Sequence, residues 1–215
     1  MRTVTDKAIA VAREVQERAS RRPPGRRDEL LAAALDVIRR DGPGASMDDM
    51  AREAGITKPV LYRYFGDRDG LILAVADRFS EVLVGRLETA LAGAGGRQTE
   101  EVISAAIESY VAFIEEDPAL YGFLAQQAAP DSPALVAVID RVVTVIAEVI
   151  RENFEALGLD SRPASTWAHG VVGMVHLAGA RWARHPDVPR AQLVADLTAL
   201  MAHGLTGTTA PLQLS

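Results

Sequence analysis

A run of hydroxyl, cationic and phenolic side chains offers the clearest chemistry in this sequence. Thr57, Lys58, Tyr62, Arg63 and Tyr64 stand within one short segment. Side chains of these types donate hydrogen bonds to phosphate oxygens, and lysine and arginine also bind base edges in the major groove of DNA. If a short helix directs them outward, the segment has the chemistry of a nucleic-acid-binding surface.

Two short helices joined by a tight turn are expected to position these side chains. Ser46 is expected to cap a helix over residues 47–54, and Gly55 is expected to end that helix in a left-handed conformation. Thr57 is expected to cap a second helix that runs to residue 65. Such a pair of helices, crossing at a steep angle, is typical of a helix-turn-helix.

The inner face of the second helix is predicted to be apolar. Leu61 and Phe65 are expected to face the core together with Ile56, which leaves Tyr62 facing outward and Tyr64 at the edge. The alternative is packing alone, because two short helices around a glycine are common in all-α proteins. The outward cationic and phenolic cluster favours DNA binding over that alternative.

The distribution of charge agrees with this interpretation. The 215 residues carry a net charge of −6, which by itself argues against a protein that coats nucleic acid. Residues 1–70, however, hold 14 basic and 12 acidic side chains, whereas residues 71–215 hold 9 and 17. Residues 18–27 contain five arginines and no acid. The sequence therefore combines a mildly basic N-terminal part with an acidic remainder.

Several classes of function find no support in the composition. The absence of cysteine excludes disulfides, iron–sulfur clusters, cysteine-bound zinc and thiol catalysis. We find no cofactor fingerprint and no spacing of nucleophile, base and acid, so the sequence predicts neither an enzyme nor a bound cofactor. His169 and His176 lie about 10.5 Å apart along a helix, too far to share a metal ion. Without a signal peptide or a long apolar run, we expect a cytoplasmic protein with no membrane contact.

The whole chain is predicted to be all-α. Residues 8–18 fit either a short helix or a frayed tail, and the glycines of 93–96 precede no strand–helix unit, so they do not predict a phosphate loop. Apolar residues at helical spacing predict helices over residues 27–40, 68–92, 99–116, 117–127, 133–156, 163–184 and 189–205. We expect an N-terminal extension over 1–25, a three-helix helix-turn-helix domain over 26–70 and a helical domain over 71–215.

The apolar content of residues 99–184 exceeds what a thin helical bundle needs, so these helices are candidates to enclose a small hydrophobic ligand. The alternative for each residue is ordinary core packing. The candidate lining residues are Tyr110, Phe113, Tyr121, Phe123, Leu124, Ile139, Val143, Trp167 and His169.

The motif, which covers roughly residues 27–71, strongly resembles the N-terminal domain of TetR-family transcriptional regulators. The resemblance rests on the run from Met47 to Phe65, including the letters LYRYF, and on the segment DRDGL that follows Gly66. It implies a dimer that binds a palindromic double-stranded DNA operator and is released by a small effector. Some relatives are activators or bind DNA only with their ligand, so the sign of the response stays open.

The resemblance also assigns roles to residues. Positions such as Ser46, Thr57, Tyr62, Tyr64 and Arg68 contact phosphates in that family. Lys58, Pro59, Val60 and Arg63 occupy positions that face bases or nearby backbone. The arginines before residue 27 are expected to reach an adjacent groove, and Arg26 and Arg27 are candidate DNA contacts at the start of the first helix.

Two C-terminal helices are implied to form a four-helix dimer interface. The helix over 163–184 is rich in small residues, which allow another helix to approach closely. The last helix carries an apolar stripe, and core packing within one chain is the alternative. The candidate interface residues are Gly173, His176, Ala180, Leu193, Leu197, Leu200 and Met201.

A weaker resemblance concerns the ligand. The segments FIEEDP and GVVGM resemble a TetR subgroup that includes regulators of fatty-acid metabolism, which sense acyl-CoA.

A rival of another class is a helical ligand-carrying or protein-binding module with a vestigial helix-turn-helix. Preference for one DNA sequence over random duplex discriminates a specific regulator from such a module.

Overall fold

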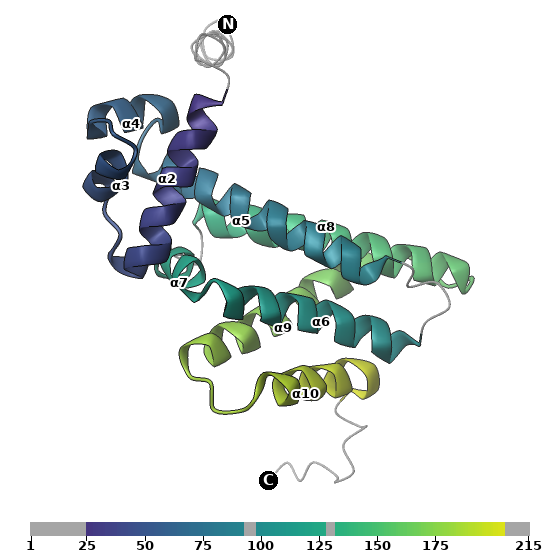
Figure 1. Ribbon diagram of the computed structural model, residues 1–215. Helices are drawn as coiled ribbons and strands as arrows, with labels where there is room; N and C mark the ends of the chain where they lie inside the picture. The colour runs from purple at the N-terminus through teal and green to yellow at the C-terminus, as the bar shows by residue number, and fades with distance from the viewer. Residues whose placement is uncertain (1–24, 93–97, 128–131, 205–215) are drawn as a thin grey trace, which may run out of the picture. The chain divides into compact units, whose positions relative to one another are not determined.

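The computed structural model describes residues 25–92, 98–127 and 132–204, and those residues form α-helices and one 3-10 helix without any strand. The expected helix over 8–18 and the glycines of 93–96 lie outside the described residues. Figure 1 shows the helices in chain order. They are α2 (Arg26–Asp41), η1 (Gly42–Gly44), α3 (Met47–Glu53), α4 (Lys58–Phe65), α5 (Arg68–Leu91), α6 (Thr99–Glu116), α7 (Pro118–Gln127), α8 (Pro133–Ala156), α9 (Ala164–Arg184) and α10 (Arg190–His203).

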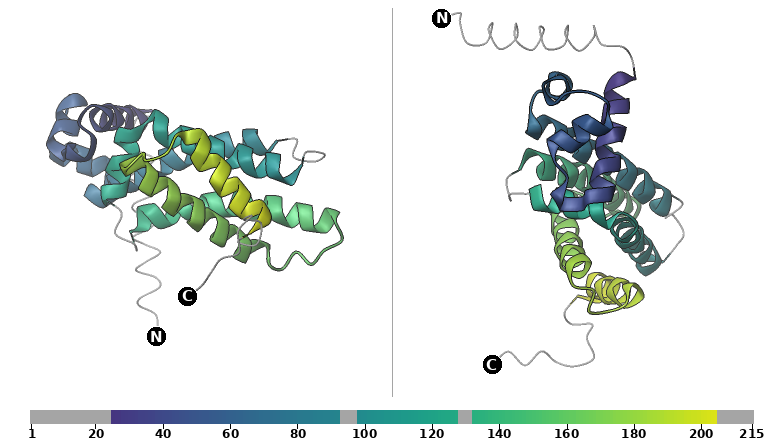
Figure 2. Two further views of the ribbon diagram at one scale, coloured as in Figure 1. Left: turned by 90° about the horizontal axis from the view of Figure 1, so that it is seen from below. Right: turned by 60° about the vertical axis from the view of Figure 1, so that its left-hand side comes forward.

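The chain divides into two compact units, Met1–Val75 and Ala76–Ser215, which we call unit 1 and unit 2. In unit 1, α2 packs against α3, and α3 packs against α4 (Figure 2, right). Repetition of apolar residues at helical spacing gives α2 one buried face. That face consists of Leu30, Leu31, Ala34, Leu35, Val37 and Ile38.

The turn between α3 and α4 confirms most of the local expectations. Ser46 caps α3 by accepting a hydrogen bond from the Asp49 backbone N–H at 3.2 Å. Gly55 has a φ of +65°, as expected of a left-handed helix end. One expectation was wrong, because Ile56 is only half-buried. Thr57 occupies the N-cap of α4 as expected, but its side chain makes no capping bond.

Unit 2 is built from packed helix pairs. α8 packs along α9, α10 packs along α6, and α6 also contacts α9 and α7 (Figure 2, left). The β-branched α8 is a helix, as its length and spacing predict. Among the most buried side chains of this unit are Leu83, Val111, Ile114, Phe123 and Ala168.

Small residues allow α9 to approach α6 closely. An ideal Cβ placed on Gly179 would lie 2.7 Å from Cε1 of Tyr110, so only glycine fits beside that ring. A Cβ on Gly170 or Gly173 would meet nothing within 4 Å. The glycines of α9 therefore serve two purposes, because Gly179 packs within the chain while the other two lie on an open face.

Candidate nucleic-acid interface

Helix α4 has one buried and one exposed side. Leu61 is fully buried and Phe65 is 8% exposed, so these two residues pack α4 into the core of unit 1. Thr57, Pro59 and Arg63 are exposed on the other side. This division follows from the apolar spacing of four residues, which places Leu61 and Phe65 on one face of a helix. The predicted contact residues therefore project from a helix whose position is fixed by its core side.

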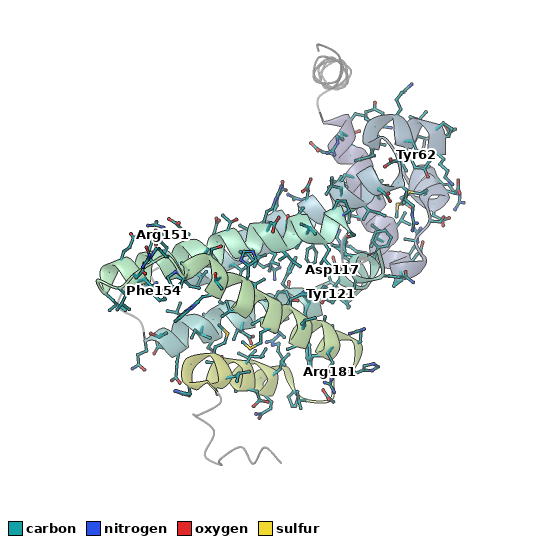
Figure 3. All side chains as sticks on the ribbon, turned by 180° about the vertical axis from the view of Figure 1, so that it is seen from behind. Tyr62, Asp117, Tyr121, Arg151, Phe154 and Arg181 are labelled. Carbon is teal, nitrogen blue, oxygen red and sulfur yellow. The ribbon has the colours of Figure 1, made fainter. Side chains whose placement is uncertain are left out.

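The remaining predicted DNA contacts lie around this exposed side. Val60, Tyr62 and Tyr64 are half-buried, and Arg68, in the first turn of α5, is exposed. The position of Tyr62 on α4 is marked in Figure 3. Ser46 is half-buried, and its Oγ is engaged with Asp49 in capping α3.

Lys58 has a carboxylate partner that no pattern in the sequence indicates. Its Nζ lies 3.0 Å from Oδ2 of Asp48, in the first turn of α3. The hydrogen bond to Asp48 and the negative charge of that carboxylate raise the pKa of Lys58 above its ordinary value. The pair joins the starts of α3 and α4, and its partners are ten residues apart in the chain, so local spacing does not reveal it.

Arg26 and Arg27 begin α2. The guanidinium of Arg27 lies 4.9 Å from the ring centroid of Phe65, a cation–π contact that joins the start of α2 to the end of α4. Arg26 forms an ion pair with Glu29 at 2.7 Å. Arg27 is thus placed beside the end of α4, whereas Arg26 is paired within its own helix.

The junction of α4 and α5 is fixed by a glycine whose role the sequence alone does not indicate. Gly70 donates its backbone N–H to Oδ1 of Asp67 at 2.8 Å, which caps the start of α5. An ideal Cβ on Gly70 would lie 2.0 Å from the carbonyl oxygen of Phe65. The absence of a side chain at Gly70 therefore lets α5 begin directly against the last residue of α4.

The predicted ligand-binding residues of unit 2 fall into two groups. Phe113, Tyr121, Phe123 and Val143 are buried, while Tyr110, Leu124 and Ile139 are half-buried. Trp167 is 55% exposed and packs edge-on against Phe154, with ring centroids 5.0 Å apart, and His169 is also exposed. The helical period placed these two residues correctly on α9 but could not reveal that they lie on the surface of the chain.

Unit 2 has an open hollow of about 370 Å³ on its surface between α5 and α8. None of the residues predicted to bind the ligand lines it. Its lining residues are Glu81, Val84, Gly85, Glu88, Arg141 and Thr144.

The predicted dimer residues are likewise divided. Gly173 lies on the open face of α9, and Ala180, Leu193, Leu200 and Met201 are half-buried. Leu197 is 6% exposed and packs within the chain. Nδ1 of His176 lies 3.2 Å from the hydroxyl of Tyr110, which turns this histidine toward α6.

The described residues contain no group of three or more side chains that could hold a metal ion. None of the helices in residues 25–92, 98–127 and 132–204 is long and apolar enough to cross a membrane.

A short capped helix, a glycine turn and a second helix with an exposed cationic side define a helix-turn-helix DNA-binding domain. The family described as bacterial regulatory proteins, tetR family, matches residues 30–75, and the one described as tetracyclin repressor-like, C-terminal domain, matches residues 86–212. The chain belongs to the TetR family of transcriptional regulators. It is a DNA-binding regulator and not an enzyme.

Similar proteins agree with this assignment. An uncharacterised HTH-type transcriptional regulator of Mycobacterium tuberculosis is 32% identical over 186 residues, which cover 85% of this chain and 78% of the relative. The crystal structure of a TetR-like transcriptional regulator from Rhodococcus sp. RHA1 matches with a TM-score of 0.60 and 25% identity, covering 87% of this chain and all of that one. FadR from Bacillus subtilis, solved in complex with stearoyl-CoA, shares the fold with a TM-score of 0.61 at 15% identity, over 82% and 98% of the two chains.

Proposed function

We propose that this regulator is a cytoplasmic repressor that binds a palindromic operator as a homodimer and is released by a small hydrophobic effector. Residues 26–70 bind DNA, and residues 71–215 bind the effector and the second subunit. The observation that carries the proposal is the two-sided α4, which buries Leu61 and Phe65 and exposes a polar side. Two such helices related by a two-fold axis read half-sites about 34–36 Å apart.

Each exposed residue of unit 1 has a role in this proposal. Lys58 and Arg63 face base edges in the major groove, because lysine and arginine pair well with guanine acceptors there. Tyr62, Tyr64 and Arg68 contact phosphates, which fixes the register of the helix on the duplex. The exposure of Arg63 and Arg68 and the half-buried phenols support this division.

The DNA-binding step is tested by fluorescence anisotropy with the DNA upstream of the protein's own gene. Lys58→Ala is expected to lower operator affinity about 10- to 100-fold if it binds a base, and Tyr62→Phe by a few-fold. Arg162→Ala is the matched control, because its side chain is 90% exposed in unit 2 and its loss removes one positive charge elsewhere. Unchanged affinity in both Lys58→Ala and Tyr62→Phe refutes α4 as the recognition helix.

The dimer is proposed to form on the open face of α9. Leu177 is 71% exposed there, and Cβ atoms on Gly170 and Gly173 would meet no neighbour. A large exposed apolar side chain beside two bare glycines suits the close approach of a second helix. Leu177→Asp should give a monomer by light scattering, whereas Val136→Asp, on an exposed position of α8, should leave the dimer intact. A dimer that survives Leu177→Asp refutes this interface.

The effector is proposed to be a fatty acyl-CoA or a molecule with a similarly apolar body. The buried aromatic residues of α6 and α7 and the fold shared with FadR from Bacillus subtilis support this class. Stearoyl-CoA should lower operator affinity in the anisotropy assay. An increase in affinity would instead indicate an activator or a ligand-dependent binder, and no change would refute acyl-CoA. Equal affinity for operator and random duplex would favour the ligand-carrying or protein-binding module.

A further inference from the structure

A buried hydroxyl without a hydrogen-bond partner lies inside unit 2. Tyr121 on α7 is 8% exposed, and no described residue bonds its Oη. Buried hydroxyls in native proteins nearly always have a partner, because an unmet donor in an apolar interior is unfavourable. The hydroxyl of Tyr121 is therefore available to a group that the free chain does not supply.

Hydrogen bonds in the first turn of α7 fix the backbone of Tyr121. Asp117 caps α7 by accepting a hydrogen bond from the Leu120 backbone N–H at 3.1 Å, and the Tyr121 N–H bonds the Asp117 carbonyl at 3.0 Å. Asp117 and Tyr121 are both marked in Figure 3, at the start of α7. The capped first turn thus fixes the backbone of Tyr121, and the burial of its ring within unit 2 limits the movement of the side chain.

Two further polar groups belong to the same part of the interior. The hydroxyl of Tyr110 lies 3.2 Å from Nδ1 of His176, and the ring of Tyr110 fits beside Gly179. Tyr110 lies near enough to Tyr121 for a weak hydrogen-bonding interaction between the two phenols to affect both pKa values, but no hydrogen bond of normal geometry joins their hydroxyls. Together the three side chains form a polar group supplied by α6, α7 and α9, which we call the phenol–imidazole group.

All three members of this group are uncharged at neutral pH. Burial raises the pKa of both Tyr110 and Tyr121, and burial lowers the pKa of His176. The charge of Arg184 acts on Tyr121, but that side chain is exposed and donates its Nε–H to the carbonyl of Ala180 at 3.1 Å. The buried hydroxyl thus faces neutral groups.

Aromatic rings adjoin the polar group. The ring of Phe79 on α5 lies 6.4 Å from that of Tyr121 and 4.7 Å from that of Phe113, measured between centroids. Both phenylalanines are buried. An elongated apolar ligand that parted these rings would bring its polar end to Tyr121.

We infer that Tyr121 donates its hydroxyl hydrogen to an uncharged carbonyl oxygen of the effector, as in an ester, thioester or amide, while the apolar chain lies against Phe79 and Phe113. The inference rests on the proposed function, because it takes unit 2 to be the effector-binding part. A free carboxylate is a poorer ligand, because a buried anion needs a paired cation that the phenol–imidazole group lacks.

The test compares three probes of equal chain length, namely methyl decanoate, decanoate and decane, by isothermal titration. The wild-type protein should bind the ester more tightly than the carboxylate. Tyr121→Phe should lower affinity for the ester about three- to tenfold, the usual effect of one hydrogen bond, and leave affinity for decane unchanged. Equal ester affinity in the two proteins, or tighter binding of decanoate than of the ester, overturns the inference.

Thermal unfolding of the free protein provides a second readout. Tyr121→Phe removes no bond, so its melting temperature should equal or exceed that of the wild type, whereas Tyr110→Phe loses the bond to His176 and should melt lower. If the melting temperature of Tyr121→Phe falls as far as that of Tyr110→Phe, the Tyr121 hydroxyl has a partner in the free protein and the inference is contradicted. Tyr121→Phe should bind the operator normally. Failure of the wild type to prefer its operator would refute the proposed function independently of the ester result.

Discussion

Gly70 is the residue on which the junction of α4 and α5 depends most directly. An alanine Cβ at this position would lie 2.0 Å from the carbonyl oxygen of Phe65 and 3.1 Å from its carbonyl carbon. A backbone oxygen cannot rotate away as a flexible side chain can. Gly70→Ala therefore forces the first turn of α5 away from the end of α4, which carries the exposed polar side.

The expected loss of stability in Gly70→Ala follows from the movement that the added Cβ requires. Real Cβ atoms do not approach other heavy atoms within 3.0 Å, so the two segments must separate by at least about 1 Å. Overpacking of this kind costs about 1–3 kcal/mol. Alanine would by itself favour the helix by up to ~1 kcal/mol. We expect a net loss of about 1–2 kcal/mol in the free energy of unfolding, together with weaker operator binding.

Urea unfolding followed by circular dichroism measures this loss, and Gly85→Ala is the matched control. Gly85 lies in the same helix, and a Cβ there would meet nothing within 4 Å. The control should gain about 0.5–1 kcal/mol, because glycine in a helix interior is less favourable than alanine. A Gly70→Ala protein as stable as Gly85→Ala, with unchanged operator affinity, would refute the close contact.

Three further predictions concern single side chains. Asp48→Asn removes the charged partner of Lys58 and frees that side chain for a base edge, so affinity should rise more for the operator than for random duplex; equal changes for the two duplexes, or no change, contradict this. Ser46→Ala removes the α3 cap and should cost about 0.5–2 kcal/mol in urea unfolding, whereas no loss would show that the cap is dispensable. Burial lowers the pKa of His176 below 6.5, so its contribution to stability is present above pH 6.5 and declines as pH falls through the lowered value. His176→Gln should flatten the dependence of melting temperature on pH just below 6.5, and an identical dependence in both proteins would contradict the burial of a neutral imidazole.

Local signals in the sequence predicted the helix-turn-helix well. The Ser46 cap, the left-handed Gly55 and the buried pair Leu61 and Phe65 all follow from preferences that act within a few residues. Helical spacing also decided correctly that the β-branched α8 is a helix. The exposed side of α4 therefore follows from the order of its residues alone.

Contacts between distant residues could not be derived in this way. The pairing of Asp48 with Lys58 depends on how α3 and α4 cross, and the fit of Tyr110 beside Gly179 depends on how α6 meets α9. Helical spacing identifies an apolar face but not the surface that covers it. For that reason the apolar stripe of α10 makes Leu197 a candidate for the dimer interface but cannot show that this side chain is buried within the chain.

The central claim is that the exposed side of α4 recognises one DNA sequence, and the specificity ratio tests it most directly. Anisotropy titrations should compare the palindromic DNA upstream of the gene with a shuffled duplex of equal length and composition, each over a range of salt concentrations. We predict that the wild-type protein binds the palindrome at least about 10³-fold more tightly at physiological salt, with affinity for both duplexes falling as salt rises. Equal affinities for the palindrome and the shuffled duplex at every salt concentration would contradict the account.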